Sequence, residues 1–174
     1  MRAFKPYPMQ YYARGIQLVV SRQRKDSANP LCGVKTLSFL PHVAARREAH
    51  NATAHDAVLL NEHGRVAEAT TSNVFALRKG VLHAPGRTEG ALPGVTRKVL
   101  LELVEDAGLD LVEPLSVRDL AGAEEAFITN TTGGVVPVTM FQEKPIGRGA
   151  GKGRKGELTT RLSHAFEDLV RTHG

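Results

Sequence analysis

The sequence predicts a mixed α+β domain in which a curled β-sheet, a pseudo-barrel, is flanked by helices. Short apolar segments rich in β-branched residues recur along the chain, and turn residues separate them. Two longer segments, 95–107 and 157–170, carry apolar residues at helical spacing. Many short strands mixed with a few helices are typical of this class. The 174 residues suffice for one domain, and no linker or internal repeat divides them.

The first third of the chain predicts two strands and one helix. Residues 15–20 (GIQLVV) form a short β-branched apolar run, which predicts a strand. The polar segment 22–30 that follows predicts a loop, and 41–50 predicts a helix. A second strand is expected over 56–62, with Gly64 at the bend that follows it.

The middle of the chain predicts a hairpin and then a helix. Strands are expected at 72–78 and 81–84, separated by the turn Lys79-Gly80. The helix over 95–107 is amphipathic, and Gly108 follows it in the usual position for a helix end.

The last third predicts strands over 109–112 and 125–129, with a short helix near 116–121 between them. A further strand is expected over 135–140. Pro137 interrupts it and lacks a backbone N–H, which predicts an edge strand.

Composition narrows the class of protein. Apolar residues make up 41% and charged residues 24%, which is globular composition. The single cysteine, Cys32, allows no intramolecular disulfide, so a reducing, cytoplasmic setting is expected. No apolar run is long enough to span a bilayer, and the N-terminal residues lack the apolar core of a secretory signal. We therefore expect no membrane partner.

The net charge of +5 raises the question of nucleic-acid binding. The charges are spread, and the one cluster, around Arg148, Lys152 and Arg154, lies in a Gly-rich stretch. Aromatic residues make up only 5%, too few for base-stacking platforms. We therefore expect no nucleic-acid partner, and the basic excess suits an enzyme with anionic ligands. The histidines show no metal-ligand spacing, so no metal is expected.

Two titratable residues stand in unusual surroundings. Lys35 lies in the weakly charged, half-apolar segment LCGVKTLSFL, where burial would lower the pKa of its amine and make it a nucleophile. Glu68 lies among small polar residues in VAEATTSN, which suits a pocket. Taken alone, each also fits a simpler reading, a surface lysine at a strand end and a solvated glutamate near a hairpin.

Two segments favour anion binding. LPGVTR, with Gly94 and Thr96, opens the helix at 95, where free backbone N–H groups and the helix dipole attract an anion. NTTGG at 130–134 places hydroxyls beside two glycines, whose backbone N–H groups can stand open. A plain helix start and a loop that needs small residues explain the same segments.

Taken in order, these four segments resemble the C-terminal domain of the class IV aminotransferases, the fold-type IV pyridoxal-phosphate (PLP) enzymes. That family includes branched-chain aminotransferases, D-amino acid aminotransferases and aminodeoxychorismate lyase. The resemblance runs from about residue 15 to the C-terminus, and it implies PLP as the cofactor.

The resemblance also implies a role for each matching residue. Lys35 matches the catalytic Schiff-base lysine, and Glu68 the carboxylate beside the pyridine nitrogen. Asn73 braces the site, and Leu92 packs on the cofactor ring. The phosphate-binding positions correspond to Gly94, Val95, Thr96 and Thr131. The backbone amides that meet the substrate carboxylate correspond to Thr132 and Gly133.

The implied activity is amino-group transfer between an amino acid, with branched-chain substrates the first expectation, and a 2-oxo acid. Residues 1–174 correspond to the C-terminal PLP-binding domain alone, and the family's smaller N-terminal domain is absent from them, which puts full activity in question. A homodimer is expected. Two alternatives stay open, an aminodeoxychorismate lyase that releases pyruvate and a catalytically silent domain that binds PLP or a partner protein.

Overall fold

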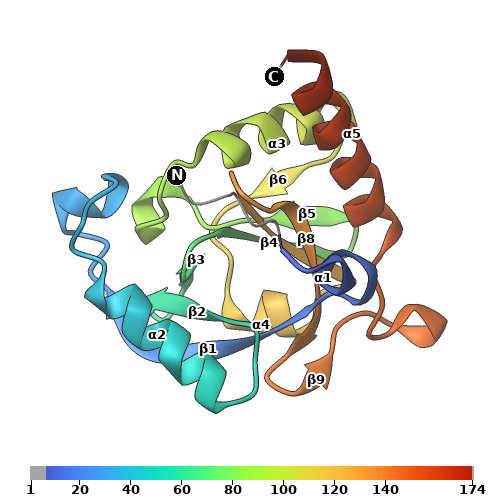
Figure 1. Cartoon of the computed structure of the whole chain (residues 1–174). Helices are drawn as coiled ribbons and strands as arrows, with labels where there is room; N and C mark the ends of the chain where they lie inside the picture. The colour runs from blue at the N-terminus through green and yellow to red at the C-terminus, as the bar shows by residue number, and fades with distance from the viewer. Residues whose placement is uncertain (1–6, 174) are drawn as a thin grey trace.

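A computed structural model describes residues 7–173. Its strands form one nine-stranded sheet, which curls into a half-barrel (Figure 1). The strands are β1 (Ile16–Lys25), β2 (Asp56–Asn61), β3 (Val66–Ala69), β4 (Asn73–Arg78), β5 (Val81–His83), β6 (Leu111–Val112), β7 (Glu125–Asn130), β8 (Gly134–Phe141) and β9 (Lys144–Pro145). Their order is β3-β2-β1-β8-β7-β4-β5-β6, with β9 paired to β8. The predicted α+β class with a curled sheet is confirmed.

Within residues 7–173, four helices lie where the sequence predicts them, and one, α1, was not predicted. They are α1 (Met9–Arg14), α2 (Leu40–Asn51), α3 (Val95–Asp106), α4 (Val117–Ala121) and α5 (Glu157–His173), with short 3-10 turns at η1 (Pro30–Gly33), η2 (Arg87–Glu89) and η3 (Gly149–Gly151). Gly108 has φ +67° just past the end of α3, the left-handed conformation that glycine adopts without strain. No helix within residues 7–173 is long and apolar enough to cross a membrane.

Alternation along the strands divides the core into an inner and an outer part. Val74 of β4 and Ile128 of β7 point into the curl, which also contains Leu120 of α4. Their neighbours Phe75 and Phe127 point outward and stack with ring centroids 5.1 Å apart. The two-residue period of a strand produces this division.

Helices cover the outer face in two places (Figure 1). Leu100 of α3 and Leu162 of α5 pack with Phe75 and Phe127. At the other end of the sheet, Ala45 and Ala49 of α2 pack on the outward side chains of β1 and β2. Alanine at these positions lets α2 lie close to the sheet, which brings its exposed face beside the candidate site.

The predicted end of the first strand is wrong. The polar segment from Arg22 was expected to be a loop, but β1 continues to Lys25 because Arg24 pairs with Leu60 and Lys25 with Asn61 in β2. Backbone pairing does not depend on the side chains being apolar, so hydrophobicity gave no sign of this extension. Its consequence is that Lys25 reaches the neighbourhood of β3.

The predicted edge position of the proline-containing strand is also wrong. β8 lies inside the sheet, between β1 and β7. Pro137 pairs with Phe127 of β7, whereas pairing with β1 begins only at Val138. The missing N–H of Pro137 therefore falls where β8 has a paired residue on one side only, which a sheet interior tolerates.

Candidate active site

Glu68 is the centre of the candidate site. It lies in β3, whose residues are all buried, and it is only 7% exposed. Lys25 Nζ donates to Glu68 Oε1 over 2.6 Å, and His42 Nε2 lies 2.9 Å from the same oxygen. The backbone N–H of Leu92 donates to Oε2 over 3.0 Å. Three segments that are far apart in the sequence thus meet at one carboxylate.

These contacts keep Glu68 ionised. Burial by itself raises the pKa of the Glu68 carboxyl, but the hydrogen bond from His42 and the charge and hydrogen bond of Lys25 outweigh it, so that the pKa lies below its ordinary value. His42 is held in place by Phe39, whose ring stacks on the imidazole at a centroid distance of 4.5 Å. Glu68 is therefore an oriented carboxylate at neutral pH, and its charge is shared with Lys25.

The turn from Leu92 to Gly94 is held from both sides. Glu68 accepts from the N–H of Leu92, and Asn73 Nδ2 donates to the Leu92 carbonyl oxygen over 2.9 Å. Asn73 also passes directly under Gly94, where an added Cβ would lie 2.6 Å from Asn73 Oδ1. The structure thus brings Glu68, Asn73, Leu92 and Gly94 together, and it shows why residue 94 has no side chain.

The start of α3 offers backbone N–H groups to an anion. Gly94 occupies the N-cap position, and no side chain caps the helix there. Val95 is 75% exposed, whereas Thr96 is buried at 5% exposure. The first amides of a helix lack partners within the helix and lie at the positive end of its dipole. Residues 94–96 therefore suit a bound phosphate.

Asn130 organises the loop that carries the remaining predicted residues. Its Oδ1 accepts from the backbone N–H groups of Thr132 (3.1 Å) and Gly133 (2.6 Å), and its Nδ2 donates to Ser72 Oγ over 2.8 Å. Those two amides were expected to stand open, but here they are paired with Asn130. The neighbouring Thr131 is exposed. A ligand carboxylate would have to replace Asn130 Oδ1 to reach the two amides.

The N-terminal tyrosines cover this loop. Tyr12 donates its hydroxyl to the carbonyl oxygen of Gly133 over 3.0 Å. A Cβ at Gly133 would lie 2.6 Å from a ring carbon of Tyr7. Tyr7 also accepts from Asn130 Nδ2 over 2.9 Å. Gly133 is therefore required by the close approach of a ring.

Lys35 lies in an exposed loop between η1 and α2. Its side chain is exposed and makes no hydrogen bond or ion pair with any residue from 7 to 173. The apolar side chains around it are exposed as well, with Leu37 at 101% and Leu40 at 76%. Lys35 therefore stands on an uncovered apolar surface.

Sequence reasoning missed Lys25 and Asn130. Lys25 gave no signal because it lies in a charged run that predicted a loop. Asn130 did give one, since an asparagine two residues before Thr132 is typical of an Asx turn, in which its side chain accepts from later backbone amides.

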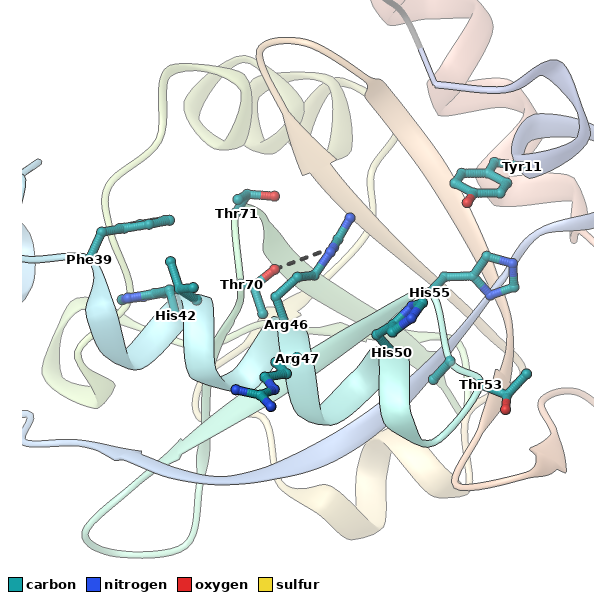
Figure 2. A pocket seen from close by; sticks show the side chains of 12 residues that line it. Tyr11, Phe39, His42, Arg46, Arg47, His50, Thr53, His55, Thr70 and Thr71 are labelled. Carbon is teal, nitrogen blue, oxygen red and sulfur yellow. Dashed lines mark hydrogen bonds between the residues drawn. The ribbon is translucent and has the colours of Figure 1, made fainter.

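A cavity of about 930 Å³ lies between α2 and α1 (Figure 2). Arg46 points into it, and Nη1 of Arg46 lies 2.9 Å from Oδ2 of the buried Asp56 and 3.4 Å from Thr70 Oγ1. Its lining includes Arg47, His42 and His50 and no carboxylate side chain. Thr70 and Thr71, which close one wall, follow Glu68 in the chain. The cavity therefore extends the candidate site with a wall that carries two guanidinium groups, of which Arg46 is paired with Asp56.

Comparison with known proteins decides the family. The family model for class IV amino-transferases matches residues 1–141. The chain belongs to the class IV aminotransferase family. It is 37% identical over 157 residues to a putative branched-chain-amino-acid aminotransferase of Methanocaldococcus jannaschii, which covers 90% of this chain and 52% of that relative. A D-alanine aminotransferase of Bacillus licheniformis is 34% identical over 166 residues, covering 94% and 57%.

Solved class IV structures confirm the fold. The branched-chain amino acid aminotransferase of Escherichia coli superposes with a TM-score of 0.85 at 28% identity, over 93% of this chain and 53% of that chain. A second branched-chain enzyme, from T.th. and complexed with N-(5'-phosphopyridoxyl)-L-glutamate, gives 0.84 at 30% identity, over 94% and 54%. The chain thus spans about half the length of the relatives it matches.

Proposed function

We propose that this chain is the cofactor-binding half of a PLP-dependent aminotransferase, which moves an amino group between an amino acid and a 2-oxo acid by a ping-pong route. The observation that carries the proposal is the buried, ionised Glu68 joined through Leu92 to the uncapped start of α3. A phosphorylated pyridine has a ring nitrogen at one end, which a carboxylate can bind, and a phosphate at the other, which the start of a helix can bind. Membership of a family whose relatives are named aminotransferases supports it.

The residues present fit this cofactor. Glu68 supplies a negative charge for a protonated ring nitrogen, and residues 94–96 supply backbone amides for a phosphate. PLP, when bound, supplies an electron sink for the charge left on the substrate carbon as its proton departs. Residues of this chain could therefore bind such a ring at its nitrogen and at its phosphate.

Lys35 is assigned the covalent role. Its Nζ would bond to the aldehyde carbon of PLP with loss of water, and its amine would later carry the proton to and from the substrate carbon. Lys25 is buried beside Glu68, at the ring-nitrogen end, whereas the aldehyde lies across the ring from that nitrogen. The position of Lys25 therefore favours Lys35 as the covalent residue.

The other predicted residues keep their proposed roles. Leu92 would lie against the ring, and Asn73 would brace the turn. The phosphate would be held by Gly94, Val95, Thr96 and Thr131. The backbone amides of Thr132 and Gly133 take the substrate carboxylate once it has displaced Asn130 Oδ1.

Substrate and assembly are also proposals. Branched-chain substrates are supported by the names of several relatives, which are 30–37% identical to this chain. A homodimer is supported by the exposed apolar surface formed by Leu37, Leu40 and Val43. We place the enzyme in the cytoplasm because its one cysteine, Cys32, is free.

Covalent trapping tests the proposed function. The full chain is incubated with PLP and reduced with borohydride, and the modified lysine is mapped by mass spectrometry. We expect one labelled residue, Lys35, and an absorbance change that requires added PLP. Absence of label at saturating PLP, or label on Lys25 instead, would contradict the proposal.

Gly94→Ala is expected to weaken PLP binding by about tenfold or more, which corresponds to one lost hydrogen bond to a charged group. The added Cβ would lie 2.6 Å from Asn73 Oδ1, so the turn that presents the α3 amides must move. A fluorescence titration with PLP measures the affinity. Gly151→Ala is the matched control, because a Cβ at Gly151 meets nothing within 4 Å. Equal PLP affinities of the two variants would mean that this turn does not bind the phosphate.

A further inference from the structure

Lys25 forms a buried ion pair with the carboxylate at the centre of the site. Its Nζ lies 2.6 Å from Glu68 Oε1, and the two side chains are 10% and 9% exposed. The pair exists because β1 runs past its apolar segment and its last residue pairs with Asn61 of β2, the neighbour of β3. The proposed role of Glu68 needs only its negative charge, so it does not explain why a lysine is paired with it.

The other groups that surround Glu68 supply no negative charge to pair with Lys25. His42 faces Glu68 from α2, and the Leu92 amide faces it from the turn before α3. The charges of Lys25 and Glu68 also act on the pKa of the Cys32 thiol in η1. Burial has the largest effect and raises this pKa, so the thiol stays neutral. Glu68 is thus the only negative charge in direct contact with Lys25 among the described residues.

A purely stabilising role explains this pair poorly. Removing two charges from water costs nearly as much as their attraction returns, so a buried ion pair adds little net stability. The strong effect of Lys25 falls instead on the proton affinity of its neighbours, because a nearby cation disfavours every protonated, positively charged form.

We propose that Lys25 is a positioning residue that fixes Glu68 as an oriented carboxylate and competes with the cofactor's ring nitrogen for its charge. The inference rests on the proposed function. Its consequence is a ring nitrogen that holds its proton less tightly than beside an unpaired glutamate. Lys25 thereby sets how strongly the cofactor withdraws electrons from the substrate.

The test follows the ring nitrogen directly. PLP labelled with ¹⁵N at that nitrogen is bound to the full chain, and its chemical shift is recorded against pH. In Lys25→Met we expect the nitrogen to lose its proton about one pH unit higher than in wild type, a tenfold gain in proton affinity. Lys25→Arg keeps the charge and should titrate like wild type. Lys144→Met, which removes an exposed charge on β9, is the matched control.

Unfolding of the cofactor-free chain gives a second readout. The pKa of Glu68 is lowered in the folded chain, so its contribution is present above the ordinary glutamate pKa and lost as the pH falls through the lowered value. In Lys25→Met the folded-state pKa of Glu68 should lie closer to its ordinary value, so the acid-induced fall of the urea midpoint should be smaller than in wild type and should end at a higher pH. This measurement does not depend on PLP.

The outcomes separate the two proposals. If wild type binds no labelled PLP, the proposed function fails, and parallel unfolding curves for wild type and Lys25→Met would then also overturn the coupling. If PLP binds and the titrations of wild type and Lys25→Met coincide, the role of Lys25 is overturned while the proposed function stands. A shift in Lys25→Met that Lys25→Arg reverses supports it.

Discussion

Lys35→Ala is expected to abolish borohydride-stable attachment of PLP. It should also slow transfer of the amino group onto PLP by about 10²- to 10⁴-fold, the usual loss when a positioned proton-transfer group is removed. The amine of Lys35 has no substitute at the aldehyde end, because Lys25 is committed to Glu68. Single-turnover absorbance measurements with an amino acid donor follow the loss.

The same substitution should leave the fold unchanged. Lys35 is exposed and its side chain has no partner among residues 7–173, so the free energy of unfolding should stay within about 0.5 kcal/mol of wild type. Lys144→Ala removes an exposed lysine from β9 and serves as the control. A Lys35→Ala variant that still transfers amino groups at the wild-type rate would exclude this residue from the reaction.

Glu68→Gln is expected to slow the same step by about 10²-fold or more, in the range found when one preorganised electrostatic group is removed. A neutral amide cannot hold a proton on the ring nitrogen, so the cofactor withdraws electrons less strongly. The variant also leaves the ammonium of Lys25 buried without a counter-charge, which should cost about 3–5 kcal/mol of stability. Single-turnover rates and urea unfolding measure the two effects.

A double variant separates catalysis from stability. Lys25→Met/Glu68→Gln removes both charges, so stability should return toward that of wild type while the slow amino transfer remains. Glu105→Gln, the same change at an exposed position of α3, should alter neither quantity. If Glu68→Gln transferred the amino group at the wild-type rate, a group other than Glu68 would have to stabilise the protonated ring nitrogen.

The sequence predicted the elements whose signals are local. The helix over 95–107 and its stop at Gly108 were visible because apolar spacing and a glycine that takes positive φ act within a few residues. Glu68 and the turn at Gly94 were recognised together through the family resemblance. The structure adds the reason that they act together, since the Leu92 amide lies against the Glu68 carboxylate.

The features that were missed depend on partners far along the chain. The extension of β1 to Lys25 is set by pairing with β2, and the interior position of Pro137 is set by where β1 begins to pair. Lys35 lies in an apolar segment, where burial would lower the pKa of its amine, yet the apolar side chains around it are exposed. Apolar side chains favour burial, but the sequence alone does not say against which surface they are buried.

The place of β1 in the sheet has a consequence for biosynthesis. β1 and β2 with α2 between them, and the hairpin of β7 and β8, can each form from nearby sequence, but residue 16 must find residue 138 before the halves join. A contact between such distant residues closes a long loop and slows folding. During synthesis on the ribosome, one edge of β1 stays unpaired until β8 has been synthesised. An unpaired strand edge invites aggregation, so the growing chain should depend on chaperones until that join forms.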